Sequence, residues 1–415
     1  MVTRRNWSQL PQELQELIIR KLSTFEDYLS FVGVCQSWRS NLVSRHHYTF
    51  FQKTLPWLML PEPQVEDDGI TYEEDDLVID EDDHNETRSF FSLSRNKVYH
   101  FDLPQAVGCH CWGSPYGWLV TCSDGNMSIL NPLSNVCVAL PPLSSLRNYS
   151  SSHSVRKVVL AISPASNTSS ATPLVNQFVA LVMFSGDKKL AFARPGDRAW
   201  TTVNSSSALY EDTVHINDQF YAIDVEGVVC RFDISTTPNQ VSLHFACLPG
   251  EIDMEEGCRF YLVEMLGELH MVARFFYLQG RYLEYYHLEH ARPFEEHHHA
   301  QTSSFQVFKL DLCTKEWKEV HTLGDYAFFL GNNTSFSLRV SEYPGCQSDA
   351  IYFTDDYKWE STLHMEGQHG KEGMESIGLD MGVFDLKTKR VKPFYDSDDV
   401  PTFLAPPIWI TPNLY

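Results

Sequence analysis

The sequence is short of positive charge. Its 415 residues include 32 Lys and Arg against 54 Asp and Glu, which gives a formal net charge of −22 at pH 7. Proteins that bind nucleic acid or an anionic membrane surface neutralise phosphates with a basic field. The chain has no such field, so the sequence predicts neither a nucleic-acid partner nor a membrane partner.

Long apolar runs and a dense cysteine framework are also missing. No stretch approaches the roughly 18 apolar residues that span a bilayer, and the opening residues MVTRRNWSQL lack the apolar core of a signal peptide. The 10 cysteines are scattered through the chain, which is typical of reduced thiols in the cytosol or nucleus. We therefore expect the protein in the nucleus, the cytoplasm or both.

The familiar motifs of catalysis are absent from the sequence. It contains no phosphate-binding glycine loop, no Gly-x-Ser-x-Gly elbow and no His-Glu-x-x-His pair. Two groups could hold a metal by residue type: the stretch HLEHARPFEEHHH (287–299) and the cysteines Cys109, Cys111 and Cys122. The first is typical of a polar loop, and the second lacks a fourth ligand at zinc spacing. We predict no catalytic residue, no metal site and no cofactor.

The acidic charge is concentrated in one part of the chain. Residues 54–87 contain thirteen Asp and Glu and no Lys or Arg, whereas residues 1–53 carry seven basic and four acidic residues. Acidic runs of this kind are typical of solvated tethers. The sequence therefore predicts three parts: a helical module at 1–53, an acidic linker at 54–87 and a β-rich domain at 88–415.

Two amphipathic helices are predicted in the first part. Leu10, Leu14, Ile18 and Leu22 recur at intervals of four, and a second apolar stripe runs from Tyr28 to Leu42 at intervals of three and four. So few residues cannot bury all of this apolar surface among themselves. Two interpretations remain: a helical cap packed on the main domain, or a surface that a partner protein covers.

The residues of this part resemble an F-box. The resemblance is carried by LPQELQELIIRKLSTFEDYLSFVGVCQSWRS: the opening Leu-Pro, the Glu-Leu pair, the Ile and Leu spacing, and the closing Val-Cys-x-x-Trp-Arg. It implies docking on a Skp-type adaptor and, through the adaptor, on a cullin-based ubiquitin ligase. The residues that it assigns to adaptor binding are Leu10, Pro11, Leu14, Ile18, Leu22, Val34, Cys35 and Trp38. Gly33 departs from the helical pattern, since glycine weakens a helix by about 1 kcal/mol relative to alanine.

The sequence pattern of the remainder of the chain predicts short strands separated by turns. A short sequence unit recurs in this part of the chain. It consists of an Asp or Asn between two apolar residues, followed by a turn, and it occurs at Leu130–Leu133, Phe232–Ile234, Leu310–Trp317 and Phe384–Lys389. Each unit is typical of the third strand of a blade, a turn capped by the Asp or Thr side chain, and an outer fourth strand. We predict an all-β propeller, with six blades favoured and seven possible. The strand at Phe90–Leu103 and the C-terminal TFLAPPIWI should close it within one blade.

This region also resembles the carboxy-terminal domain of a large plant F-box family. That domain is a kelch-like propeller, which was formerly classified as a domain of unknown function. The carrying segments are LPWLMLP, FFSLSRNKVYHFDLP, CWGSPYGWLV and ILNPLSNVCVALPPL, together with the late DAIYFTDD and GVFDL. The resemblance implies a non-catalytic substrate-recognition subunit of a Skp-cullin-F-box ubiquitin ligase, whose propeller binds an unknown target protein. A hydrolase-like propeller enzyme and a non-degradative interaction scaffold are the alternatives.

A target-binding surface is expected on a long insertion of the propeller. The stretch YLQGRYLEYYHLEHARPFEEHHH is polar yet rich in aromatic residues, and exposed aromatic and arginine side chains commonly dominate binding energy. The candidate target-binding residues are Arg281, Tyr282, Tyr285, Tyr286 and Arg292. An insertion that touches nothing is the alternative.

Overall fold

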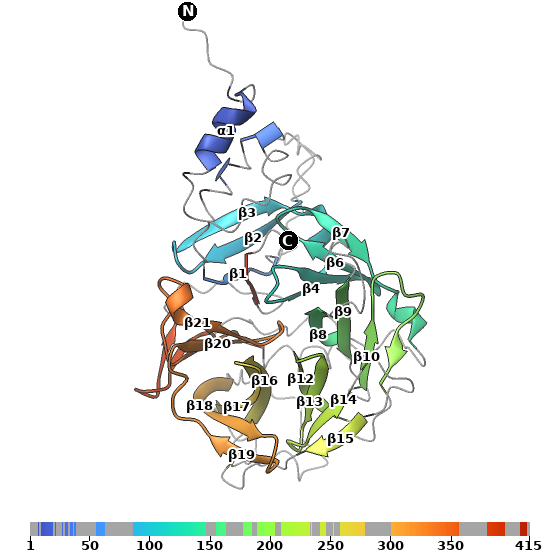
Figure 1. Ribbon diagram of the computed structural model, residues 1–415, viewed down its shortest axis with the longest axis vertical. Helices are drawn as coiled ribbons and strands as arrows, with labels where there is room; N and C mark the ends of the chain where they lie inside the picture. The colour runs from blue at the N-terminus through green and yellow to red at the C-terminus, as the bar shows by residue number, and fades with distance from the viewer. Residues whose placement is uncertain are drawn as a thin grey trace, which may run out of the picture.

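The computed structural model describes most of the β-rich part and a smaller share of the helical part. The described residues are 7, 10–19, 21, 27, 30–31, 34–35, 37–38, 55–62, 86–146, 155–162, 177–184, 189–203, 209–232, 234, 241–245, 252, 258–278, 300–356, 380–394 and 407–412. Within them the strands form six sheets arranged around a centre, with the helix α1 (Gln12–Ile19) beyond the outer strand of one sheet (Figure 1). The prediction of a six-bladed propeller behind a small helical module is confirmed.

The six blades follow the chain, except that the first contains both early and late strands. The closing blade has the order β25 (Ile408–Ile410), β1 (Trp57–Met59), β2 (Thr87–Ser92) and β3 (Lys97–Asp102). The second has β4 (His110–Gly113), β5 (Leu119–Ser123), β6 (Asn126–Asn131) and β7 (Val136–Ala139). The third has β8 (Val155–Ile162), β9 (Phe178–Phe184), β10 (Lys189–Ala193) and β11 (Thr201–Thr202).

The other three blades complete the circle. The fourth has β12 (Tyr210–Ile216), β13 (Gln219–Asp224), β14 (Val229–Phe232) and β15 (Val241–Phe245). The fifth has β16 (Cys258–Met265), β17 (Glu268–Leu278), β18 (Ala300–Asp311) and β19 (Glu316–Glu319). The sixth has the order β21 (Phe336–Arg339), β20 (Tyr326–Leu330), β22 (Ala350–Phe353), β23 (Gly382–Asp385) and β24 (Arg390–Pro393), in which β20 and β22 run parallel. In the described part of the chain, short 3-10 helices lie at Pro104–Ala106, Leu143–Ser145 and Val340–Glu342.

Burial falls from the middle of a blade toward its outer edge. All seven residues of β9, FVALVMF, are buried, because neighbouring blades cover both faces of the sheet. The outer strands β19 (EWKE) and β24 (RVKP) are largely exposed and carry charges. Charged outer strands protect the unpaired sheet edge from pairing with another chain.

The predicted repeating turn occurs between the third and fourth strands of three blades. The side chains of Asn131, Asp311 and Asp385 each accept hydrogen bonds from the backbone N–H groups two and three residues later, at 2.8 to 3.2 Å. The residue four positions on, Asn135, Lys315 or Lys389, has a φ of 55° to 61° and donates its N–H to the carbonyl of the capping residue. The turn that the sequence unit predicts is therefore the one that these blades share.

The two ends of the β-rich part close the ring. β1 pairs with β25 on one side, with Trp57 opposite Ile410, and with β2 on the other, with Trp57 opposite Ser92. The C-terminal strand thus meets an early strand in one blade, as expected. The early strand next to it is β1, which lies inside the 54–87 stretch that we expected to be linker, and the most acidic stretch, residues 63–85, lies outside the described residues.

Candidate functional site: a docking helix and a propeller face

Helix α1 has one buried and one exposed face. Ile19 is 5 % exposed and Gln15 is 1 % exposed, with the Gln15 side-chain amide donating to the Leu10 carbonyl oxygen at 2.7 Å. On the other face Leu14 is 46 % exposed and Leu17 is 58 % exposed. Two leucines left open to solvent one turn apart form an apolar surface that no described residue covers.

The predicted adaptor-binding residues divide between this surface and the core of the module. Pro11, Leu14 and Val34 are exposed, Leu10, Ile18 and Cys35 are half-buried, Trp38 is buried, and Leu22 lies outside the described residues. The predicted set does not include Leu17. Its position three residues after Leu14 would have placed it on the same helix face. Trp7, which is 60 % exposed, was missing too.

Trp38 is a core residue of the module. Its ring lies 4.4 Å from that of Phe31, and its indole N–H donates to the backbone oxygen of Trp7 at 3.0 Å. Together with Ile19, these buried rings belong to the same hydrophobic cluster as Trp57 and Ile410 of the closing blade. The inner face of the helical module therefore packs with the propeller, while the Leu14–Leu17 face does not.

The predicted second helix is not continuous. Asp27, Ser30–Phe31 and Ser37–Trp38 are helical, but Val34 and Cys35 are not, and the other positions of the Tyr28–Leu42 stripe lie outside the described residues. The prediction of one uninterrupted helix is thus wrong. The interruption includes Val34, the residue after Gly33. In a helix interior, glycine lowers helix stability more than any residue except proline.

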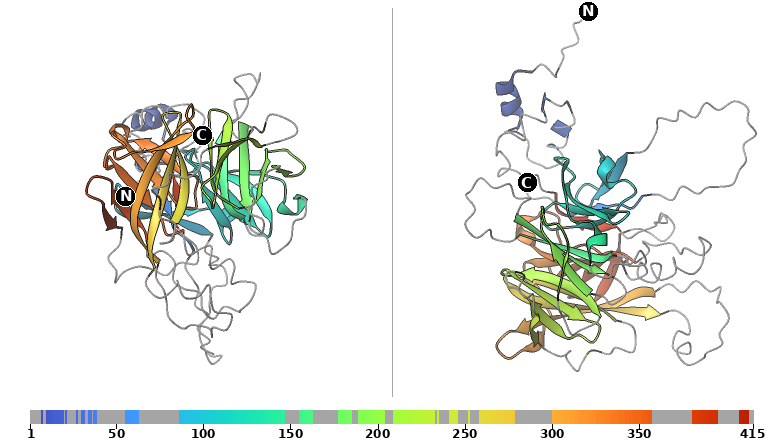
Figure 2. Two further views of the ribbon diagram at one scale, coloured as in Figure 1. Left: turned by 90° about the horizontal axis from the view of Figure 1, so that it is seen from below. Right: turned by 90° about the vertical axis from the view of Figure 1, so that its right-hand side faces the viewer.

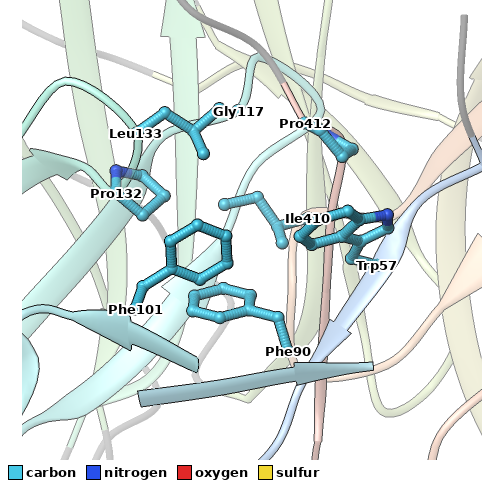
Figure 3. Close-up of a pocket in the computed structure, with 8 residues that line it drawn as sticks. All are labelled: Trp57, Phe90, Phe101, Gly117, Pro132, Leu133, Ile410 and Pro412. Atoms are coloured by element: carbon cyan, nitrogen blue, oxygen red, sulfur yellow. The ribbon is translucent and has the colours of Figure 1, made fainter. Parts of the chain in front are cut away.

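A small apolar pocket lies at the seam between the closing blade and the second blade. Figure 3 shows Phe90 and Phe101 below Pro132 and Leu133, with Trp57, Ile410 and Pro412 on the other side. The Trp57 ring lies 5.0 Å from Tyr99 and 6.0 Å from Phe101. The same strands that close the ring therefore also form this pocket, which contains no charged lining residue.

Polar side chains fill the centre of the propeller. The segment Gly331–Ser335, which we call the axial loop, joins β20 to β21, and Asn333 is fully buried. The Thr334 N–H donates to the Gly113 carbonyl at 3.1 Å, and the Trp409 N–H donates to the Asn333 side chain at 3.3 Å. The axial loop of the sixth blade thus bonds to the second blade and to the closing blade.

Buried charges surround the axial loop and pair with one another. Lys157 Nζ lies 2.5 Å from Asp212 Oδ1 and 3.3 Å from the Ser335 hydroxyl, and both members of the ion pair are almost fully buried. Nearby, burial and the charge of Arg259 lower the pKa of Arg156 to about 10. These groups come from the inner strands β8, β12 and β16. The charged side chains at the centre therefore contact one another and the axial loop within the same chain.

Arg274 forms the second half of this network, between the fifth and sixth blades. Its guanidinium contacts Asp356 at 3.0 Å and Asp380 at 2.9 Å, and it donates to the Tyr261 hydroxyl at 3.2 Å. Burial alone would lower the pKa of Arg274, but Tyr261 and the two carboxylates raise it above its usual value. Burial also raises the pKa of Tyr261, so this hydroxyl stays protonated and donates to Asp356 at 2.8 Å.

The groups weighed as metal ligands are placed as follows. Burial raises the pKa of Cys111 to about 12 and also raises those of Cys109 and Cys122, which favours thiols over the thiolates that bind zinc. Among the described residues no three His, Cys, Asp or Glu side chains gather as a metal site. Residues 287–299 lie outside the described residues, as do the candidate target-binding residues Arg281, Tyr282, Tyr285, Tyr286 and Arg292.

Comparisons with known proteins agree with this architecture. Residues 7–48 match the F-box domain model, and residues 90–385 match the KIB1-4 beta-propeller model. F-box protein SKIP23 of Arabidopsis thaliana is 24 % identical, covering 98 % of this chain and 96 % of its own length. F-box protein At2g17036 of the same plant is 26 % identical, covering 98 % and 95 %.

Solved structures add little. Regucalcin from Agrobacterium tumefaciens matches with a TM-score of 0.33 at 9 % identity, covering 75 % of this chain and 86 % of that one. A likeness at this level carries no argument about function.

An F-box joined to a β-propeller defines the class of F-box propeller proteins, in which the F-box implies binding to a Skp1-type adaptor. This chain belongs to the KIB1-4 β-propeller family of F-box proteins. The combination is that of substrate receptors in Skp-cullin-F-box ligases generally, and F-box proteins are typically non-catalytic adaptors. The kelch-like description of the blades remains a prediction, since the matching model is that of the KIB1-4 propeller. No helix among the described residues is long and apolar enough to cross a membrane.

Proposed function

We propose that this protein is the substrate-recognition subunit of a Skp-cullin-F-box ubiquitin ligase. The helical module docks on a Skp-type adaptor and through it on a cullin, and the propeller binds a target protein for ubiquitination. The protein itself carries no catalytic step and acts in the nucleus, the cytoplasm or both. The observation that supports this proposal best is the exposed Leu14–Leu17 face of α1, whose opposite face is already buried.

The binding free energy expected from docking can be estimated from the two exposed leucines. Fully burying a leucine side chain is worth about 1.5–3 kcal/mol, and Leu14 and Leu17 are each about half exposed. Covering both should therefore contribute roughly 2 kcal/mol, which is more than a tenfold change in affinity at about 1.4 kcal/mol per factor of ten.

Adaptor binding tests the proposal directly. Co-expression with a Skp-type adaptor should give a complex that survives gel filtration, and Leu14→Ala with Leu17→Ala should weaken it at least tenfold by titration calorimetry. Leu312→Ala is the matched control, because Leu312 is 49 % exposed on the turn between β18 and β19. A double variant that binds as tightly as the control would contradict the docking proposal.

The structure also bears on the alternatives. A propeller enzyme would present catalytic groups to substrate in the central channel, whereas here Lys157, Asp212, Arg274 and Asp356 are no more than 2 % exposed and bond to one another or to the axial loop. This arrangement favours a binding domain over a hydrolase. A non-degradative scaffold would differ in one outcome: its partners would not accumulate when the proteasome is inhibited.

Target binding is proposed for the insertion between β17 and β18. Arg281, Tyr282, Tyr285, Tyr286 and Arg292 remain its candidate residues, because large aromatic and arginine side chains commonly act as binding hot spots. Replacing residues 279–299 with a Gly/Ser linker of equal length should abolish capture of the target while adaptor binding persists. Unchanged capture would place the target elsewhere on the propeller.

A further inference from the structure

The hairpin of β23 and β24 is strongly basic in a chain that is acidic as a whole. Residues 382–394 contain four cations and one carboxylate, a formal charge of +3, whereas the whole chain has a net charge of −22. The cations lie within six consecutive positions, and all of them are exposed: Lys387, Lys389, Arg390 and Lys392. We call this stretch the basic hairpin.

The carboxylate within the basic hairpin is occupied by the turn. Asp385 lies directly opposite Arg390 in the strand pairing. Its Oδ1 nevertheless accepts the backbone N–H groups of Lys387 and Thr388, at 2.8 and 2.9 Å. Its Oδ2 accepts from the side-chain amide of Gln347 at 2.9 Å. Both oxygens therefore have partners, and the guanidinium across the strands is left to solvent.

Only Lys387 pairs with a carboxylate among the described residues. Its Nζ lies 2.9 Å from Asp349 Oδ2 and is still largely open to solvent, with 65 % of the side chain exposed. No described carboxylate lies within 4.0 Å of Lys389, Arg390 or Lys392. Three neighbouring cations are thus available to a partner.

Protection of the sheet edge does not account for this distribution of charge. A charge of either sign discourages an edge strand from pairing, and the outer strand β19 (EWKE) combines both signs. β24 (RVKP) carries cations alone and ends in Pro393, which already has no N–H to donate. Moreover, Lys387 and Lys389 lie in the turn, where there is no strand edge to protect.

The basic hairpin lies at the rim of the propeller. β24 is the last strand of its sheet, and in the left-hand view of Figure 2 the orange and red strands of this blade lie on the opposite side of the ring from the green strands of the third and fourth blades. Arg390 and Lys392 point to the same face of β24, because alternate residues of a strand share a face. Their positions are about 7 Å apart along the strand, the spacing at which an extended peptide presents every second side chain.

We propose that the basic hairpin is a docking surface for an acidic, extended segment of a partner protein, with Asp or Glu at alternate positions. The carboxylates of this segment pair with Lys389, Arg390 and Lys392. Since salt screens charges beyond about 10 Å at 0.1 M, a short segment interacts mainly with the hairpin. A nucleic acid extends farther and meets the acidic remainder of the chain, so a peptide is the better fit.

This surface is separate from those already proposed. No residue of the basic hairpin belongs to the Leu14–Leu17 face or to the insertion at 279–299. The inference therefore goes beyond the proposed function and does not depend on it.

Peptide binding to the full chain tests the inference. Fluorescence anisotropy with a fluorescein-labelled peptide of four Glu-Ser repeats should show binding at low salt that weakens as salt is added. The triple variant Lys389→Gln, Arg390→Gln and Lys392→Gln should bind about tenfold more weakly, a change that three exposed ion pairs of ordinary strength together produce. Its thermal unfolding midpoint should stay the same, because the three side chains are exposed.

A matched control separates the basic hairpin from net charge. The control variant replaces three exposed cations in the closing, third and fifth blades with glutamine, and so has the same net charge as the triple variant: Arg95→Gln, Arg198→Gln and Lys315→Gln. Its affinity for the peptide should stay within about twofold of the unmodified chain. Equal weakening in the two variants, or no peptide binding by the unmodified chain at low salt, would overturn the proposal.

Two further arms test other occupants. A single-stranded oligonucleotide with the same charge as the peptide should bind more weakly than the peptide, and tighter binding would assign the surface to nucleic acid instead. A chain in which residues 63–85 are replaced by a Gly/Ser linker of equal length should bind the peptide with unchanged affinity. A tenfold gain in that chain would identify its own acidic residues as the occupant and would contradict docking of a separate partner.

Discussion

Replacing Trp409 with alanine should weaken the closure of the propeller more than any change in an outer strand. Trp409 is the middle residue of β25 and is fully buried. Its ring lies edge-on to Phe329 at 5.2 Å and to Phe394 at 5.8 Å, and its indole N–H donates to the Leu330 carbonyl at 3.0 Å. The side chain therefore ties the C-terminal strand to the sixth blade as well as to β1.

The expected loss follows from these contacts. Removing a buried tryptophan side chain costs about 3–5 kcal/mol. Losing the indole hydrogen bond adds roughly 0.5–1.5 kcal/mol, because the Leu330 carbonyl still accepts from the Thr354 N–H at 3.2 Å. Unfolding entropy is about 2.1 cal/mol/K per residue near 60 °C. For 415 residues, a loss of about 5 kcal/mol lowers the Tm by roughly 6 °C.

Differential scanning calorimetry measures this shift, with Trp317→Ala as the control. Trp317 is only half-buried and lies in the outer strand β19, so its removal should give a clearly smaller shift. Deleting Thr402–Tyr415 removes β25 altogether and should abolish cooperative unfolding of the propeller. If Trp409→Ala melts within about a degree of Trp317→Ala, or the truncated chain melts like the full one, the closing strand does not carry the stability assigned to it.

Three further changes test the centre and the rim of the propeller. Gly113→Ala should cost about 1–3 kcal/mol or more in urea denaturation, since a Cβ would overlap the carbonyl oxygen of Trp409; an unchanged midpoint would contradict this close approach. Lys157→Met should cost roughly 3–5 kcal/mol because it removes the cation that pairs with the buried Asp212 carboxylate. Adding Asp212→Asn should restore part of that loss, and a double variant no more stable than Lys157→Met would contradict the pairing. Burial raises the pKa of Asp349, but hydrogen bonds from Thr322 and Lys387 outweigh it and lower the pKa below 3.8, so its stabilisation is present above that pH and is lost as the pH falls through the lowered value. Asp349→Asn should thus be less stable than the unmodified chain at pH 7, and this difference should shrink as the pH falls below 3.8. A difference in stability that does not depend on pH would refute the assignment.

The repeated turn was the most predictable part of the fold. An Asp or Asn at the end of a third strand caps its own turn, so the signal is contained within a few consecutive residues, as at Asp311 and Asp385. Local chemistry of this kind can be read from sequence because no distant residue decides it. The apolar runs of the inner strands were predictable for the same reason.

The centre of the propeller could not be predicted in this way. Arg274 meets Asp380 and Lys157 meets Ser335 across separations of 106 and 178 positions, and a charged residue within a strand pattern gives no sign of its partner. The division of the predicted adaptor-binding residues into exposed and buried ones could not be predicted for a similar reason. Helical periodicity placed Leu14 and Trp38 on apolar faces, but only packing against Phe31 decides that Trp38 is buried while Leu14 stays exposed.

The position of β1 explains how a β-rich chain can present a helical module in a fixed orientation. β1 lies between β25 and β2, with paired neighbours on both sides, so it is held more firmly than an edge strand would be. Trp57 of this strand also shares its hydrophobic cluster with Ile19 and Trp38 of the module. The first strand after the helices is thus a central strand of the blade that closes the ring. Because closure and attachment of the module use the same strand, a chain whose ring is open should also lose the packing that orients α1.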